Sequence, residues 1–154
     1  MNSATASSEP TAGGGAPGGG NQPPLVKLNV APETITFAGT ATLTALVSDD
    51  GLPRAAPVGP ASPNAAPTAG GRARGLHVKW VHYRGPGTVR LRPDRSPIPT
   101  DGKAVTDAEV VTTASFSEPG TFVLRAVADD GSWFSTAEVT VTVVGASGTD
   151  ATRR

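Results

Sequence analysis

The segment formed by residues 114–131 constrains the fold of this chain more than any other. It reads ASFSEPGTFVLRAVADDG, two stretches of alternating apolar and polar residues separated by a Glu-Pro-Gly corner. Alternation with a period of two predicts half-buried β-strands, and the closing Asp-Gly pair is a strong hairpin signal. Residues 137–144 alternate in the same way. Three successive antiparallel strands are therefore expected near the C-terminus.

Similar alternation recurs along the rest of the chain, punctuated by glycine and proline. Pro32 interrupts the first such stretch, as is typical of a strand at the edge of a sheet. No segment shows helical periodicity, and residues 93–103 are expected to form a turn-rich connection. Seven or eight short strands predict an all-β, immunoglobulin-like two-sheet sandwich. The expected strands span residues 25–30, 33–37, 40–47, 76–83, 88–92, 109–116, 121–128 and 137–144.

The chain of 154 residues is expected to hold one domain between two polar segments. Residues 1–24 are rich in glycine and proline, and they offer too little apolar surface to offset the entropy of ordering. They are interpreted as a disordered leader or linker, followed by a sandwich at 25–145 and a polar tail at 146–154. Residues 52–75, between the second and third main strands, form a Pro/Ala-rich loop. It is too long for an ordinary connection and is expected to be disordered.

The core is expected to centre on Trp80, which shares one face of its strand with other apolar residues. Phe116, Phe122 and Leu124 flank the Glu-Pro-Gly corner. We expect these three side chains to pack over Trp80 and to hold the two sheets together.

Composition excludes several classes of function. The chain carries 13 basic and 13 acidic residues, so it lacks the basic field of a nucleic-acid-binding protein. It contains no cysteine, which excludes disulfides and thiolate chemistry. No apolar run approaches the roughly 20 residues that cross a bilayer, and no signal peptide is visible. A monomer without a membrane span is expected.

Four features together resemble the PKD-like, immunoglobulin-like repeats of large secreted bacterial proteins. They are Trp80, the RGPGTV turn at 84–89, the segment 114–131 and the VTVTV strand at 139–143. The resemblance covers roughly residues 26–144 without the long loop. The Trp-x-Phe-Gly-Asp-Gly signature of typical PKD domains is absent, since Val-His-Tyr-Arg follows Trp80. The resemblance implies an extracellular or periplasmic location and a structural or interaction role.

Two acidic turns form the candidate metal site. In an immunoglobulin-like topology, the loop after the second main strand and the last hairpin lie at the same pole. Asp49, Asp50, Asp129 and Asp130 would then supply part of the six to eight oxygens that Ca²⁺ takes. The alternative, which we favour, is that both triplets are ordinary turns in which aspartate binds its own backbone. Neither spacing matches an EF-hand loop.

Other candidate sites have simpler interpretations as well. The basic stretch at 72–95 would attract an anionic glycan, but cross-strand pairing with the acidic stretch at 101–138 is favoured. Trp133 and Phe134 would form a sugar platform, yet alternation places Trp133 on the core side and Phe134 outside. Hairpin packing is therefore favoured for this pair.

Histidine chemistry is not expected. His77 and His82 are five residues apart on one strand and so face opposite sides, which excludes a shared metal. His82 is expected at the rim of the core. No nucleophile, base and acid form a recognisable set.

The predicted function is a non-catalytic structural or interaction module whose partner is a protein or cell-surface glycan. The alternatives are a carbohydrate-binding accessory domain and a calcium-dependent adhesion unit.

Overall fold

The computed structural model describes residues 20–52 and 75–146, which contain nine strands and no helix. No helix in these ranges is long and apolar enough to cross a membrane. The predicted leader, loop and tail fall largely on residues 1–19, 53–74 and 147–154, outside the described residues. The strands are β1 (Leu25–Leu28), β2 (Glu33–Thr36), β3 (Thr40–Asp49), β4 (His77–Arg84), β5 (Val89–Arg92), β6 (Arg95–Pro97), β7 (Val105–Phe116), β8 (Gly120–Asp129) and β9 (Phe134–Val144).

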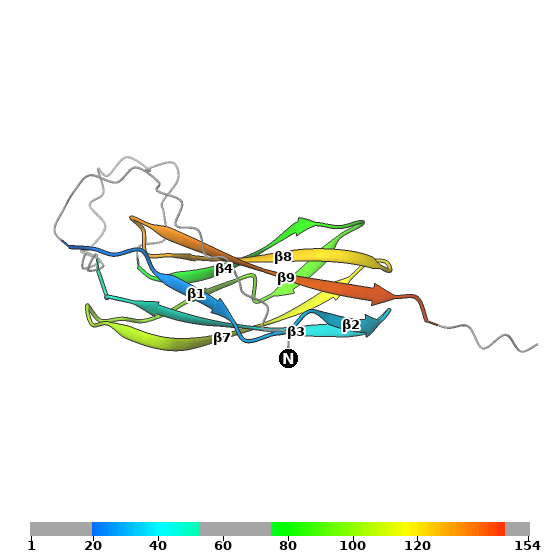
Figure 1. Ribbon diagram of the computed structural model, residues 1–154, viewed down its shortest axis with the longest axis horizontal. Coiled ribbons are helices and arrows are strands. Elements are labelled where there is room, and N and C mark those ends of the chain that lie inside the picture. Colours follow the sequence, from blue (N-terminus) through cyan, green and yellow to red (C-terminus); the bar gives the residue numbers. More distant parts are fainter. Residues whose placement is uncertain (1–19, 53–74, 147–154) are drawn as a thin grey trace, which may run out of the picture.

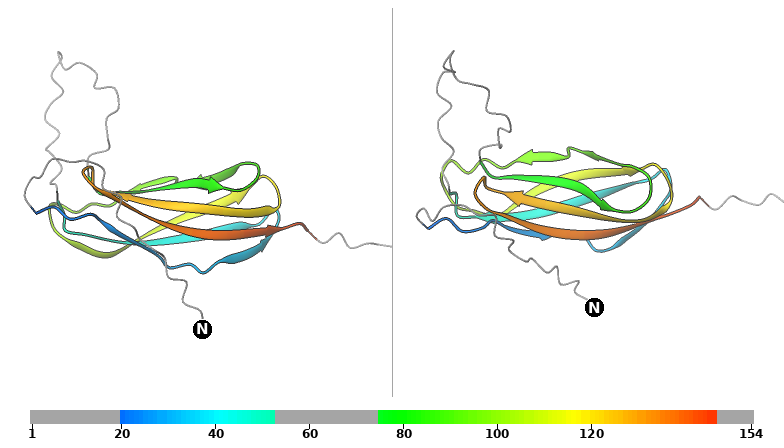
Figure 2. Two further views of the ribbon diagram at one scale, coloured as in Figure 1. Left: turned by 45° about the horizontal axis from the view of Figure 1, so that its top comes forward. Right: turned by 90° about the horizontal axis from the view of Figure 1, so that it is seen from above.

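The strands form two sheets that face each other (Figures 1 and 2). The four-stranded sheet has the order β1-β3-β7-β5, and the five-stranded sheet has the order β2-β9-β8-β4-β6. Every pairing is antiparallel except that of β2 with β9, which is parallel. The prediction of an all-β domain built from two sheets is therefore confirmed.

Period-two alternation explains how the core forms between the sheets. Along β3, β8 and β9, buried residues alternate with more exposed ones. Each strand therefore buries one apolar face, which supplies the main favourable free energy of folding. The most deeply buried large side chains come from both sheets: Trp80, Phe122, Leu43, Leu124, Val26, Val47, Val78 and Val141.

The aromatic contact predicted for the Glu-Pro-Gly corner is present. Phe116 on β7 and Phe122 on β8 belong to different sheets, and their ring centroids lie 4.6 Å apart. Leu124 and Trp80 are buried in the same cluster. This contact joins the two sheets next to the corner that separates β7 from β8.

Residues 93–103 are not wholly a connection, as the sequence suggested. Residues 95–97 form β6, which pairs with the start of β4 at the edge of the five-stranded sheet. Three residues ending in a proline are too few to show alternation, so the pattern missed them. β7 and β9 also begin earlier than predicted, at Val105 and Phe134. The described residues thus contain nine strands where seven or eight were expected.

The predicted break at Pro32 is present, and the structure adds that the chain changes sheet there. β1 lies at the edge of the four-stranded sheet, whereas β2 lies at the edge of the other. Proline has no N–H to give to a ladder and is tolerated where edge strands end. The N-terminal chain therefore contacts both layers in turn.

The described chain begins and ends at opposite poles of the domain. Leu25 pairs with Ser48 near the end of β3, whereas Val144 ends β9 beside Thr36. Figure 1 shows the blue start and the red end of the coloured chain at opposite ends of the long axis. We call the end that carries Asp49, Asp50, Asp129 and Asp130 the acidic pole.

Substituting alanine for Gly51 should destabilise the domain by at least about 2 kcal/mol. Gly51 has φ of 80°, and a Cβ there would lie 2.3 Å from the carbonyl oxygen of Lys103. Gly131→Ala is the matched control, because its φ is 96° but a Cβ would meet nothing within 4 Å. Urea unfolding should show a clearly larger loss for Gly51→Ala. Equal losses would mean that the Lys103 backbone yields freely.

Candidate functional site

The four aspartates of the acidic pole act first as turn residues. Asp49 Oδ2 accepts the N–H of Gly51 at 2.8 Å, and Asp129 Oδ1 accepts the N–H of Gly131 at 2.6 Å. Each aspartate thus binds the backbone two residues ahead, the geometry of an Asx-turn. Three further backbone N–H groups bind here, those of Leu52 to Asp50 and of Ser132 and Trp133 to Asp130.

The segment before β1 ties the two acidic turns together. Asn21 Nδ2 donates to Asp130 Oδ2 at 3.1 Å, and the N–H of Gln22 donates to Asp50 Oδ2 at 2.8 Å. Pro24 is fully buried. Asn21, Gln22 and Pro24, which lie inside the stretch interpreted as a leader, therefore contact the domain. Nothing in the Gly/Pro-rich sequence distinguishes Asn21 from its neighbours, so sequence reasoning missed it.

Asp49 has the most perturbed carboxyl group of the pole. Its side chain is 8 % exposed, and burial raises its pKa from 3.8 to about 6. The N–H of Gly51 opposes this shift, whereas the nearby charges of Asp130 and Asp50 add to it. Asp130 is 2 % exposed. The structure therefore places two buried carboxylates, one from each turn, close enough to repel each other.

Two buried oxygens at this pole have no hydrogen-bond partner, Asp49 Oδ1 and Asn21 Oδ1. Buried polar atoms are nearly always paired, so each such atom calls for an explanation. Within residues 20–52 and 75–146, no three Asp, Glu, His or Cys side chains are grouped as in a metal centre. The predicted set of Asp49, Asp50, Asp129 and Asp130 is thus not a four-carboxylate cluster, and calcium binding stays a prediction.

The two histidines lie apart, as predicted. His77 Nε2 lies 3.0 Å from Arg95 Nη2, and its Nδ1 lies 3.1 Å from the carbonyl oxygen of Gly75. Because arginine only donates, Nε2 accepts and Nδ1 carries the proton. His82 is partly buried, with its ring centroid 5.7 Å from that of Phe122. The His77 ring is therefore held by local hydrogen bonds, whereas the His82 ring packs against Phe122 and its Nε2 is buried without a hydrogen-bond partner.

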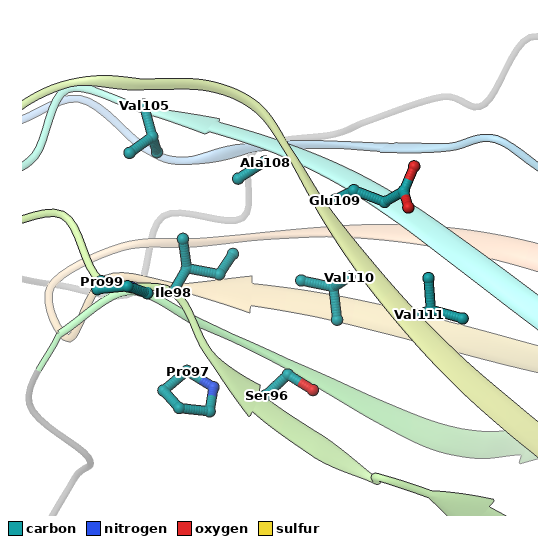
Figure 3. Close-up of a pocket in the computed structure, with 9 residues that line it drawn as sticks. All are labelled: Ser96, Pro97, Ile98, Pro99, Val105, Ala108, Glu109, Val110 and Val111. Carbon is teal, nitrogen blue, oxygen red and sulfur yellow. The ribbon is translucent and has the colours of Figure 1, made fainter.

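A groove between the two sheets is the second candidate site, and sequence reasoning did not find it. Its volume is about 450 Å³, and it lies where β5 ends, because β5 pairs only with residues 113–116 of β7. Figure 3 shows Ile98 and Val110 between the two segments that line it. The nine lining residues are Ser96, Pro97, Ile98, Pro99, Val105, Ala108, Glu109, Val110 and Val111. Glu109 is the one ionisable group among them, so few polar groups would orient a small ligand.

The aromatic side chains near the surface are Tyr83, which is exposed, and Trp133 and Phe134, which are partly exposed. Arg125 lies over the exposed Tyr83, with its guanidinium carbon 3.5 Å from the ring centroid. That face of the ring is covered. Trp133 is partly exposed and lies outside the core, so its predicted inward position was wrong. The reason is that β9 begins only at Phe134, so the alternation does not extend to Trp133.

Among the described residues, the cross-strand ion pair lies within the acidic stretch at 101–138 and does not join it to the basic stretch. Arg125 pairs with Glu138 across β8 and β9, with Nε 2.8 Å from Oε1. It is the one ion pair among the described residues. In the basic stretch the pairing prediction was wrong: Arg90 lies opposite Ser115. Lys79 lies opposite Arg95, another cation.

Comparisons with known proteins include a distant likeness to a solved structure. No protein-family model matches the chain, and no curated protein matches it. The crystal structure of the S-layer protein SbsC domains 4 and 5 aligns with 78 % of this chain at a TM-score of 0.43 and 12 % identity. The chain spans about half of that structure, 51 %. The class of this protein therefore rests on its own strands, which make a two-layer all-β domain.

Proposed function

We propose that this chain is a non-catalytic structural or interaction module of an exported bacterial surface protein. The observation that carries the proposal is the position of the two chain ends. The described residues begin at the acidic pole and end at the opposite pole. Neighbouring domains joined to such a module lie in series along its long axis, the arrangement of a spacer.

The strand order supports an immunoglobulin-like, PKD-like version of this module. The order β1-β3-β7-β5 corresponds to strands A, B, E and D of an immunoglobulin domain, and β9-β8-β4 corresponds to G, F and C. The short β6 extends the second sheet beyond β4. The residues that carry the resemblance, among them Trp80 and Phe122, form the centre of the core.

The use of the polar side chains supports a non-catalytic role. The aspartates hold turns, and the His77 ring is held by Arg95 and the Gly75 carbonyl. A catalytic base needs a free, positioned nitrogen or oxygen next to a reacting group. The Tyr83 ring, covered by Arg125, likewise gives little support to the alternative of carbohydrate binding.

Tension along the long axis should load the β2–β9 ladder lengthwise. β2 and β9 are parallel, the chain enters β2 from the side of the acidic pole, and it leaves β9 at the other pole. Pulling the two ends apart therefore strains all hydrogen bonds of the ladder together. In single-molecule pulling of the full chain between reference domains, we expect one cooperative unfolding event, as for a two-state domain.

A pair of double variants tests this geometry. Thr34→Pro with Ile35→Pro removes two backbone N–H groups from β2, whereas Thr34→Ala with Ile35→Ala truncates the same side chains and keeps both N–H groups. We expect the proline variant to unfold at a clearly lower force than the alanine variant. If both unfold at the same force, the β2–β9 ladder does not resist tension, and the spacer proposal loses its support.

A further inference from the structure

The two orphan oxygens at the acidic pole point to a bound cation, an inference that goes beyond the spacer role. We propose that Asn21, Asp49 and Asp130 bind one divalent cation of the calcium class, which joins the N-terminal segment to both acidic turns. The proposal keeps two of the four aspartates considered from the sequence and adds an amide that the sequence did not indicate. It rests on the positions of individual oxygen atoms.

The hydrogen bonds of Asp130 show why two oxygens remain. Asp130 Oδ1 accepts the N–H groups of Ser132 and Trp133, at 2.6 and 2.7 Å, and Oδ2 accepts the Asn21 amide at 3.1 Å. Asp130 therefore has a donor on each oxygen. Asp49 accepts one hydrogen bond, on Oδ2. Its Oδ1 is buried without a partner, and because Asp49 is only 8 % exposed, bulk water does not reach this oxygen. A charged oxygen left in this way costs free energy.

The orientation of the Asn21 amide is fixed by Asp130. Exchanging its nitrogen and oxygen would turn the amide oxygen toward Asp130 Oδ2, and two acceptors would then face each other. The amide oxygen must therefore point away from Asp130, where it is buried and unpartnered. The pole thus contains two unpartnered acceptors beside the Asp130 carboxylate, whose Oδ2 accepts a single N–H and keeps one lone pair for a cation.

A cation satisfies this arrangement better than a proton does. A proton on Asp49 Oδ1 creates one donor, which leaves the two acceptors with a single hydrogen between them. A cation accepts electron pairs from both oxygens and also offsets the repulsion between the neighbouring buried carboxylates of Asp49 and Asp130. The count of hydrogen-bond donors and the electrostatics of the pole therefore both favour a cation over a proton.

The ligand atoms select the kind of cation. All of them are oxygens, the ligands that hard cations such as Ca²⁺ and Mg²⁺ prefer. Zinc sites, in contrast, are built mainly from nitrogen and sulfur ligands. Ca²⁺ accepts irregular geometry, whereas Mg²⁺ requires a near-ideal octahedron. With two carboxylates and one amide, the affinity should fall in the range of extracellular modules, with Kd of about 10⁻⁴–10⁻³ M.

Thermal unfolding of the full chain tests the site. Adding about 10 mM CaCl₂ in place of a chelator should raise Tm by about 5 °C, because a ligand that binds only the native state stabilises it. Terbium, a luminescent substitute for Ca²⁺, should show emission sensitised by Trp133, whose backbone N–H donates to Asp130. Trp133→Phe should remove that emission and keep the Tm response. A Tm that does not move with CaCl₂ would overturn the proposal.

Three variants of Asn21 and Asp49, with Asp94→Asn as the control, test whether the Tm response to CaCl₂ arises at these residues. Asp49→Asn and Asn21→Ala should each abolish the CaCl₂ shift, whereas Asp94→Asn, a change at an exposed carboxylate elsewhere, should keep it. Asn21→Asp is the sharpest case, because it should lower Tm in chelator by adding a third carboxylate and enlarge the shift with CaCl₂. A shift that persists in Asp49→Asn, or that does not grow in Asn21→Asp, would show that the cation does not bind at these residues.

Discussion

Phe122→Ala should lower the free energy of unfolding by about 3–5 kcal/mol, the range for removing a fully buried phenylalanine. Phe122 is 0 % exposed, and its ring contacts Phe116 of the other sheet and His82 of its own. Truncation would leave a cavity between the sheets, which packed neighbours refill only in part. Since a domain of this size has only about 5–15 kcal/mol of stability, a large share would be lost.

Urea unfolding followed by tryptophan fluorescence measures this loss, with Phe134→Ala as the matched control. Phe134 has the same side chain but is only partly buried at the start of β9. Its truncation should cost much less, about 1 kcal/mol. If Phe122→Ala costs no more than Phe134→Ala, the Phe116–Phe122 contact does not join the sheets in solution.

Asp49→Asn should stabilise the domain at pH 8 in the presence of a chelator. Burial raises the pKa of Asp49 to about 6 in the folded state, against 3.8 as the ordinary value. The folded state therefore binds the proton more tightly than the unfolded state does. The resulting stability is fully present below about pH 4, and it declines as the pH rises through 6. The difference amounts to at most about 3 kcal/mol.

Asparagine imitates the protonated acid at every pH, so the gain from Asp49→Asn should begin near pH 4 and be complete above about pH 6. At about pH 3 the variant and the parent should be equally stable, and at pH 8 the variant should be more stable by up to about 3 kcal/mol. Asp94→Asn provides a control for the loss of one negative charge at an exposed position. A gain that is independent of pH would show that the Asp49 carboxyl does not titrate in the expected window.

Much of the fold was predictable because β8 and β9 alternate without interruption. Their period-two pattern places Phe122, Leu124 and Val141 in the core, where the structure has them. β6 was not predictable, since its three residues gain their structure from pairing with β4 rather than from their own sequence. Likewise, no local pattern indicates that β2 pairs in parallel with the last strand.

The acidic pole was predictable in outline but not in detail. Turn residues and the expected topology placed the Asp49 and Asp130 turns at one end, and in the structure the two side chains lie near each other. Which oxygens remain free depends on the backbone N–H groups that reach each carboxylate, and on Asn21. These contacts depend on three-dimensional positions, and the spacing of residues does not encode them.

The pairing of β2 with β9 has a consequence for the order of folding. The bond between Asn21 and Asp130 likewise joins residues 109 positions apart, so the two ends of the domain depend on each other. Contacts of such long range are slow to form, and folding dominated by them takes milliseconds to seconds. During synthesis, β1 can pair with β3 early, but β2 finds its partner only after β9 has been made. The five-stranded sheet therefore gains its edge strand β2 in a late step of folding.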